Sequence, residues 1–133
     1  MSAERATYLD SSAVVKLAVR EPESATLRRY VRRKRPLLTS ALSRTEVARA
    51  LLPFGLDVVT RGEDVLRRLD VIRVNDRVLR AAGALLPSEL RSLDAIHLAT
   101  AIEIGADLAR VCTYDERMAA AAIDLGLAVV APS

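Results

Sequence analysis

The sequence predicts a three-layer α/β/α domain, in which a central parallel sheet is flanked by helices on both faces. Short apolar runs alternate with longer segments of helical periodicity, which is the pattern of parallel strands joined by crossover helices. The 133 residues suit one domain with one core. The 51% hydrophobic and 28% charged contents are ordinary for a globular protein, and the three Tyr, one Phe and absent Trp leave a core of Leu, Val, Ala and Ile.

The predicted elements follow one another with short connections. The strands are short apolar runs, at 6–9, 37–39, 71–74, 110–113 and 128–130. The helices lie between these runs, at 13–18, 22–35, 43–52, 60–69, 76–86, 93–104 and 118–125. No internal repeat, low-complexity tract or linker interrupts this order, so the chain is expected to be a single domain over 1–133.

In the first half of the chain, proline and capping patterns set the predicted helix starts. Pro22 is expected to open the second helix, because its fixed φ suits the first helical position. Two capping boxes, Ser43-x-x-Glu46 and Thr60-x-x-Glu63, predict the starts of the next two helices.

In the second half of the chain, polar caps set the predicted helix starts, and proline and glycines set the predicted helix ends. Asn75 is expected to cap one helix, which Pro87 ends, and Ser92 is expected to cap the helix that follows. Gly105 and Gly126 are expected to terminate the last two helices, because glycine readily adopts the backbone conformation of a helix end.

Four acidic residues fall where parallel sheets bind their ligands. Asp10 and Asp115 follow predicted strands, whereas Glu46 and Asp94 lie in the first turns of predicted helices. If these positions share one edge of the sheet, the four carboxylates converge on one pocket. Two carboxylates about 4 Å apart repel by roughly 4 kcal/mol at an effective dielectric constant near 20, so such a cluster calls for a cation. Oxygen ligands suit Mg²⁺ or Mn²⁺, which would hold a water nucleophile and neutralise a phosphoryl group.

Each acid also has a purely structural interpretation. Asp10 and Asp115 are suitable caps for the helices that follow them, and Glu46 is the partner of Ser43 in a capping box. Asp94 is favoured by the dipole at the start of its helix. Position alone leaves both interpretations open for every one of these residues.

The remaining reactive side chains argue against other hydrolytic mechanisms. The only histidine, His97, can share a helix face with Asp94, but it is expected to be a packed, hydrogen-bonded residue. Because there is no second histidine, metal-free RNA cleavage by an acid–base pair of histidines is excluded. The single Cys112 lies in an apolar run and is expected to point into the core. Arg91, beside the expected acidic pocket, is the best placed candidate for a contact with substrate. The arginines of 28–35 are expected to form a solvated helix face, with contact to a phosphate backbone as the alternative.

Composition and hydropathy suggest a cytoplasmic protein. The net charge is +3 and the sequence pI about 9.5, which is compatible with a polyanionic partner. One cysteine cannot form an intramolecular disulfide, so a reducing compartment is the simple expectation. The apolar runs are too short to cross a bilayer, and we expect no membrane association.

Four segments carry the candidate acids, namely Thr7–Ala13, Thr45–Val47, Arg91–Ala101 and Thr113–Asp115. In this order and with these separations they resemble PIN-domain ribonucleases, and more narrowly the VapC toxins of VapBC toxin–antitoxin modules. The resemblance spans about 7–130 and implies a single PIN-like domain. It also implies the toxin of a type II toxin–antitoxin system that cleaves RNA phosphodiester bonds.

The resemblance implies a Mg²⁺- or Mn²⁺-dependent endoribonuclease, with a role for each acid. Asp10 and Asp94 would be the principal metal ligands and Glu46 would complete the cluster. Asp115 would hold a second metal ion or orient the attacking water. The products would carry a 5′-phosphate and a 3′-hydroxyl.

The resemblance further implies that Ser11 and Thr113 donate hydrogen bonds to these carboxylates. It implies three partners: an RNA substrate, a cognate VapB-type antitoxin that blocks the site, and a second copy of the chain in a homodimer. A non-catalytic PIN fold that binds RNA or a partner is the alternative. A Mg²⁺-binding receiver domain fits less well, because its late lysine is missing: the only lysines are Lys16 and Lys34.

Overall fold

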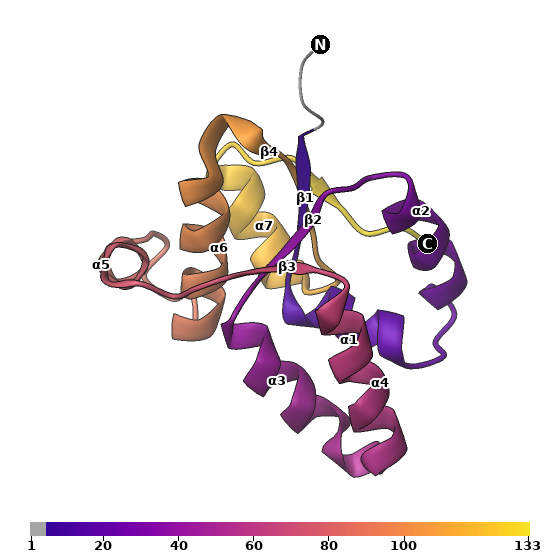
Figure 1. The fold of residues 1–133 in the computed structure, drawn as a ribbon. Helices are drawn as coiled ribbons and strands as arrows, with labels where there is room; N and C mark the ends of the chain where they lie inside the picture. Colours follow the sequence, from indigo (N-terminus) through magenta and orange to yellow (C-terminus); the bar gives the residue numbers. More distant parts are fainter. Residues whose placement is uncertain (1–4) are drawn as a thin grey trace.

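The protein, described for residues 5–133 by a computed structural model, has the predicted three-layer architecture with a central parallel sheet (Figure 1). All neighbouring strands are parallel, in the order β3-β2-β1-β4-β5. The strands are β1 (Ala6–Leu9), β2 (Leu37–Ser40), β3 (Asp70–Ile72), β4 (Leu108–Cys112) and β5 (Val129–Val130). The helices are α1 (Ser11–Ala18), α2 (Ser24–Arg32), α3 (Leu42–Leu51), α4 (Leu56–Arg67), α5 (Asp76–Gly83), α6 (Ser92–Ile104) and α7 (Glu116–Asp124), with short 3₁₀ turns at Leu52–Phe54 and Gly105–Asp107.

The two central strands contribute side chains to both faces of the sheet. Leu9 and Cys112 lie in the large cluster formed with α1, α2, α3 and α4. Their neighbours Tyr8 and Val111 lie in the cluster on the opposite face, which α6 covers. Helices α6 and α7 pack against each other on that second face, as Figure 1 also shows. The alternation of consecutive residues between two apolar layers explains why these strands have no polar face.

Most predicted elements are confirmed, with shifts of a few residues at their ends. The second helix begins at Ser24, because Glu21, Pro22 and Glu23 form a turn before it. The fourth helix begins at Leu56, directly after Gly55, whose φ of 101° suits glycine.

Both predicted capping boxes and the predicted Ser92 cap are wrong. Helix α3 begins at Leu42, before Ser43, and Thr60 lies inside α4. Ser92 is the first residue of α6, whose N-cap is Arg91. The Asn75 cap is confirmed, because its side chain accepts a hydrogen bond from the Val78 N–H.

The order of the strands reverses between β1 and β4. From β1 the chain moves outward through β2 and β3, and it then returns to the other side of β1 as β4. Ligands of open α/β sheets bind at such a reversal point, at the carboxyl ends of the strands. The Asp10 N–H donates to the Cys112 carbonyl over 3.2 Å, which joins the two strand ends at this place. Among residues 5–133, no helix is long and apolar enough to cross a membrane.

Candidate active site

Asp10 sits at the carboxyl end of β1 and is 2% exposed. Its carboxylate caps α1 by accepting from the Ala13 N–H at 3.1 Å, and it accepts from the Ser12 hydroxyl at 2.6 Å. The Thr113 hydroxyl, arriving from the end of β4, donates to its other oxygen. Burial raises the pKa of Asp10 although these hydrogen bonds oppose the shift. Asp10 is therefore both a helix cap and a buried carboxyl at the end of a strand, so the structural interpretation of its position does not exclude a role in the candidate site.

Asp94 and Asp115 face each other across Arg91. The Arg91 guanidinium lies 3.5 Å from Asp94 and 3.6 Å from Asp115. Asp115 also caps α7, accepting from the N–H groups of Arg117 and Met118. Burial and then the charge of Asp115 raise the pKa of Asp94, while Arg91 acts in the opposite direction. Burial is thus the main cause of the raised pKa of Asp94, and Arg91 only partly opposes it.

Glu46 reaches the site from the first half of α3. Its carboxylate lies 2.5 Å from Nε2 of His97, and Nδ1 of His97 lies 2.6 Å from the Tyr8 hydroxyl. His97 and Tyr8 are almost completely buried, as the sequence led us to expect for His97. Burial and then the charges of Asp10 and Glu46 raise the pKa of Tyr8, so the hydroxyl keeps its proton and can donate to His97.

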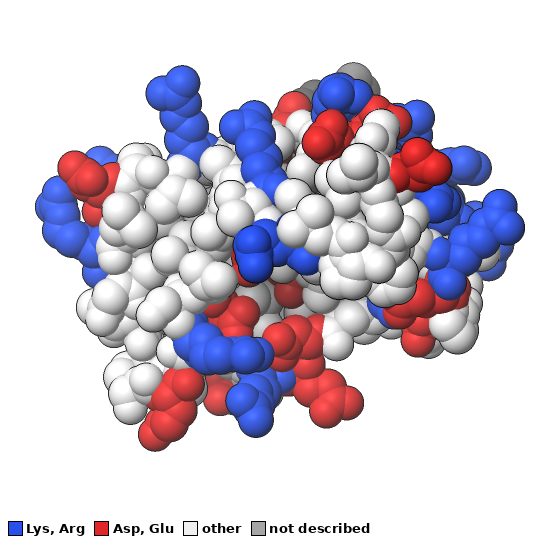
Figure 2. Space-filling model, turned by 90° about the horizontal axis from the view of Figure 1, so that it is seen from below, with Lys and Arg blue, Asp and Glu red and all other residues white. Residues whose placement is uncertain are grey.

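Three of the four predicted acids meet at one cavity of about 260 Å³. Its lining consists of Ser11, Glu46, Arg91, Leu93, Asp94 and Asp115. Asp10 does not line it, but its charge contributes to raising the pKa of Asp94. Figure 2 views the molecule from below Figure 1, the side on which β1 leads into α1, and shows acidic side chains gathered in a hollow with Lys and Arg around it.

The donor set has the chemistry of a Mg²⁺ or Mn²⁺ site, because it offers only carboxylate and hydroxyl oxygens. Within residues 5–133, however, no group of three or more His, Cys, Asp or Glu side chains is arranged to hold a metal ion. Arg91 takes the position of counter-ion between Asp94 and Asp115, and His97 engages Glu46. The four acids are thus gathered at one sheet edge, but their side chains would have to rotate to share an ion.

Sequence reasoning missed two supporting residues. Ser11 lines the cavity, but the hydroxyl that donates to Asp10 belongs to Ser12, which also accepts from the Tyr114 N–H at 2.9 Å. The helical turn after Asp10 places the i+2 side chain back over the cap, a signal that could have identified Ser12. Tyr8 was treated only as part of a strand, and nothing local in the sequence pairs it with His97.

The comparisons with known proteins agree with this geometry. The family model for the PIN domain matches residues 7–124. The chain is 62% identical to Ribonuclease VapC46 of Mycobacterium tuberculosis over 128 residues, which are 96% of this chain and 98% of that protein.

Two solved structures share the fold at low sequence identity. The structure of VapC20 of Mycobacterium tuberculosis, described as a sarcin–ricin-loop-cleaving toxin, superposes with a TM-score of 0.77 at 18% identity, covering 95% of this chain and 99% of that one. A toxin–antitoxin complex from Klebsiella pneumoniae gives a TM-score of 0.73 at 20% identity, covering 96% and 98%. Together with the family match and the 62% identical relative, this fold shows that the chain belongs to the PIN-domain family, within its VapC ribonuclease group.

Proposed function

We propose that this protein is the toxin of a type II toxin–antitoxin system, acting as a Mg²⁺- or Mn²⁺-dependent endoribonuclease on RNA phosphodiester bonds. The observation that carries the proposal is the meeting of Glu46, Asp94 and Asp115 around one cavity, with Asp10 held at the same sheet edge. The name of its 62% identical relative, a ribonuclease, agrees with it.

Asp10 and Asp94 are the principal candidates for holding the metal ion, with Glu46 and Asp115 completing the set. When bound, the ion would lower the pKa of a water molecule and neutralise charge on the phosphoryl group. The contribution of this chain is to hold four carboxylates close together in the folded state. After burial, the charges of Asp115 and Asp10 also raise the pKa of Asp94, and a bound cation would offset this repulsion.

The remaining residues orient these acids and the substrate. Ser12 and Thr113 fix the Asp10 carboxylate, and Thr113 also accepts from the Asp115 N–H at 3.1 Å. Arg91 is placed to leave its acidic partners and pair with the RNA phosphate, since its side chain is 66% exposed. Ser11 lines the same cavity.

The reaction is a hydrolysis at phosphorus. A bond forms between the water oxygen and phosphorus, the bond from phosphorus to the 3′ oxygen breaks, and a proton passes to that oxygen. The products carry a 5′-phosphate and a 3′-hydroxyl, and the ribose 2′-hydroxyl takes no part as nucleophile.

We further propose that a VapB-type antitoxin covers the site and that the toxin forms a homodimer in the cytoplasm. Support for the antitoxin comes from the fold neighbours, among them a toxin–antitoxin complex. The competing hypothesis is a non-catalytic PIN fold, which is favoured by the engagement of Asp94 and Asp115 with Arg91 and of Glu46 with His97.

The test is cleavage of total cellular RNA by purified protein with Mn²⁺, followed by mapping of the new ends. Wild type should produce 5′-phosphate ends, and Asp10→Asn and Asp94→Asn should reduce the rate by at least about a thousand-fold, in line with loss of a metal ligand. Asp57→Asn, an exposed acid on α4, is the matched control and should cleave like wild type. Cleavage by Asp94→Asn at the wild-type rate would overturn the proposal.

A further inference from the structure

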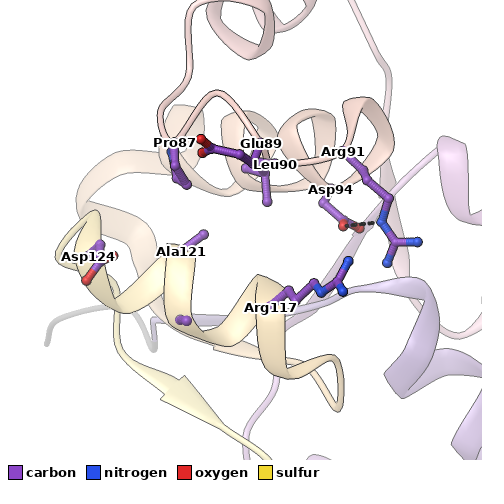
Figure 3. Close-up of a pocket in the computed structure, with 9 residues that line it drawn as sticks. Pro87, Glu89, Leu90, Arg91, Asp94, Arg117, Ala121 and Asp124 are labelled. Carbon is purple, nitrogen blue, oxygen red and sulfur yellow. Dashed lines mark ion pairs between the residues drawn. The ribbon is translucent and has the colours of Figure 1, made fainter.

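A second cavity, of about 270 Å³, shares two lining residues with the acidic one, and its lining is drawn in Figure 3. It lies between α7 and the segment that leads into α6. Arg91 and Asp94 line both cavities, so the two are neighbours that meet at these side chains. A chain molecule whose reacting group sits among the carboxylates has its next unit beside Arg91, whose exposed side chain borders this second cavity.

The walls of the second cavity are mainly apolar. Pro87 and Leu90 form one side, and Ala120 and Ala121 on α7 form the other. Small-molecule pockets usually have volumes of roughly 300–1,000 Å³, so this one is at the small end and suits a single flat ring system. Two apolar walls facing each other are the environment in which the faces of such a ring are buried.

The charged residues of the lining are ordered along the cavity. In Figure 3, Arg91 and Arg117 lie toward Asp94, whereas Glu89 and Asp124 lie toward the other end. Arg117 and Asp124 are seven residues apart on α7, which corresponds to roughly 10 Å along a helix. The cavity thus offers cations next to the acidic site, apolar walls in the middle and carboxylates beyond them.

A nucleotide has the same order of chemical groups. We propose that this cavity binds the base of the nucleotide next to the scissile phosphate, and that it favours bases with an exocyclic amino group. Arg91 and Arg117 flank the phosphate, the apolar walls cover the faces of the base, and Glu89 and Asp124 accept from its amino group. Adenine, cytosine and guanine carry this donor, whereas uracil does not. The proposal rests on the endoribonuclease function proposed above.

The test uses short RNAs with one cleavage site, each with A, C, G, U or an abasic nucleotide at the position beside the scissile bond. At one of the two positions that flank the scissile bond, an abasic nucleotide should lower the wild-type cleavage rate at least about ten-fold, relative to the RNA with the preferred base there. Ala120→Leu fills the cavity from an exposed helix position and should remove this difference. Ala81→Leu, the same change at an exposed position of α5 outside the cavity, should keep it.

A second pair of variants tests the carboxylates. Glu89→Gln and Asp124→Asn should each reduce the ratio of the cleavage rate for RNAs with amino-bearing bases to the rate for the RNA with uracil. Fluorescence anisotropy should show that the Asp10→Asn protein binds the same RNAs with the same base preference, although it does not cleave them. If wild type cleaves RNA but treats abasic and intact substrates alike, the cavity proposal is wrong and the nuclease proposal stands. If Ala120→Leu keeps the base preference and loses only antitoxin binding, the cavity belongs to the antitoxin, which also overturns the proposal.

Discussion

Glu46 and His97 are joined by a contact of 2.5 Å between Oε1 and Nε2, although 51 residues separate them in the sequence. The other ring nitrogen of His97 lies 2.6 Å from the Tyr8 hydroxyl. In the tautomer protonated at Nε2, the ring donates to Glu46 and accepts from Tyr8, so both nitrogens have a partner. The only histidine of the chain therefore positions an acid of the site, and both its nitrogens are engaged.

We expect His97→Phe to lower the cleavage rate about 10- to 100-fold, the usual effect of losing a residue that orients a metal-site carboxylate. Glu46→Ala should cost at least as much, because it removes both this contact and the carboxylate. The double variant should be little worse than Glu46→Ala alone, because His97 acts through Glu46. Steady-state cleavage of one RNA by the four proteins measures this. Additive losses would show that His97 acts independently of Glu46.

Arg91 should have opposite effects on metal and RNA binding. It pairs with Asp94 and Asp115 in this structure, and partly exposed ion pairs contribute about 0.2–1 kcal/mol each. Removing the arginine should therefore tighten Mn²⁺ binding a few-fold, whereas KM for RNA should rise because a phosphate partner is lost. Calorimetry with Mn²⁺ and steady-state kinetics of Arg91→Gln measure the two effects. A loss of Mn²⁺ affinity in this variant would contradict the role of Arg91 as a competing cation.

The raised pKa values of Asp10 and Asp94 predict how stability depends on pH without metal. The folded protein binds protons at these groups more readily than the unfolded chain, so their contribution to stability falls as pH rises from the ordinary aspartate pKa through the raised values. Above that interval both carboxylates destabilise the fold. The melting temperature of Asp94→Asn relative to wild type, measured in EDTA, should therefore increase as the pH rises above about 4, the ordinary aspartate pKa. A constant difference would show that Asp94 has no perturbed pKa.

Two helical glycines should respond in opposite ways to the same substitution. A Cβ at Gly62 would lie 2.6 Å from a methyl of Leu51 and 3.1 Å from Val47, whereas a Cβ at Gly83 meets no atom within 4 Å. Gly62→Ala should destabilise the contact between α3 and α4 by about 1–3 kcal/mol, as overpacked cores do. Gly83→Ala should stabilise the protein by up to about 1 kcal/mol through helix propensity. Urea unfolding of both variants checks the two signs.

The architecture followed from the sequence because alternating apolar runs and helical segments are local signals. The strand order, by contrast, depends on contacts between distant residues. The donor to Asp10 was also not identified from the sequence: it is Ser12, where Ser11 was predicted. Capping predictions failed where tertiary contacts use the same side chains. Ser43 bonds to Thr39 at 2.7 Å and Glu46 to His97, so neither is available to cap α3.

The positions of the acids were predictable because strand ends in a parallel sheet lie at one edge. Their side-chain partners were not, since Arg91 is three residues from Asp94 but reaches Asp115 only in the folded chain. The structure also shows that capping and site formation coincide at Asp10 and Asp115, where the sequence presented them as alternatives.

The most direct test of the central claim is a calorimetric titration of the purified protein with Mn²⁺, repeated on Asp10→Asn, Asp94→Asn and the control Asp57→Asn. Wild type and the control should bind the ion with equal affinity, and each site variant should weaken binding at least about ten-fold, because both acids belong to one site. Unchanged Mn²⁺ affinity in both Asp10→Asn and Asp94→Asn would contradict the claim that these distant acids form a single cation site.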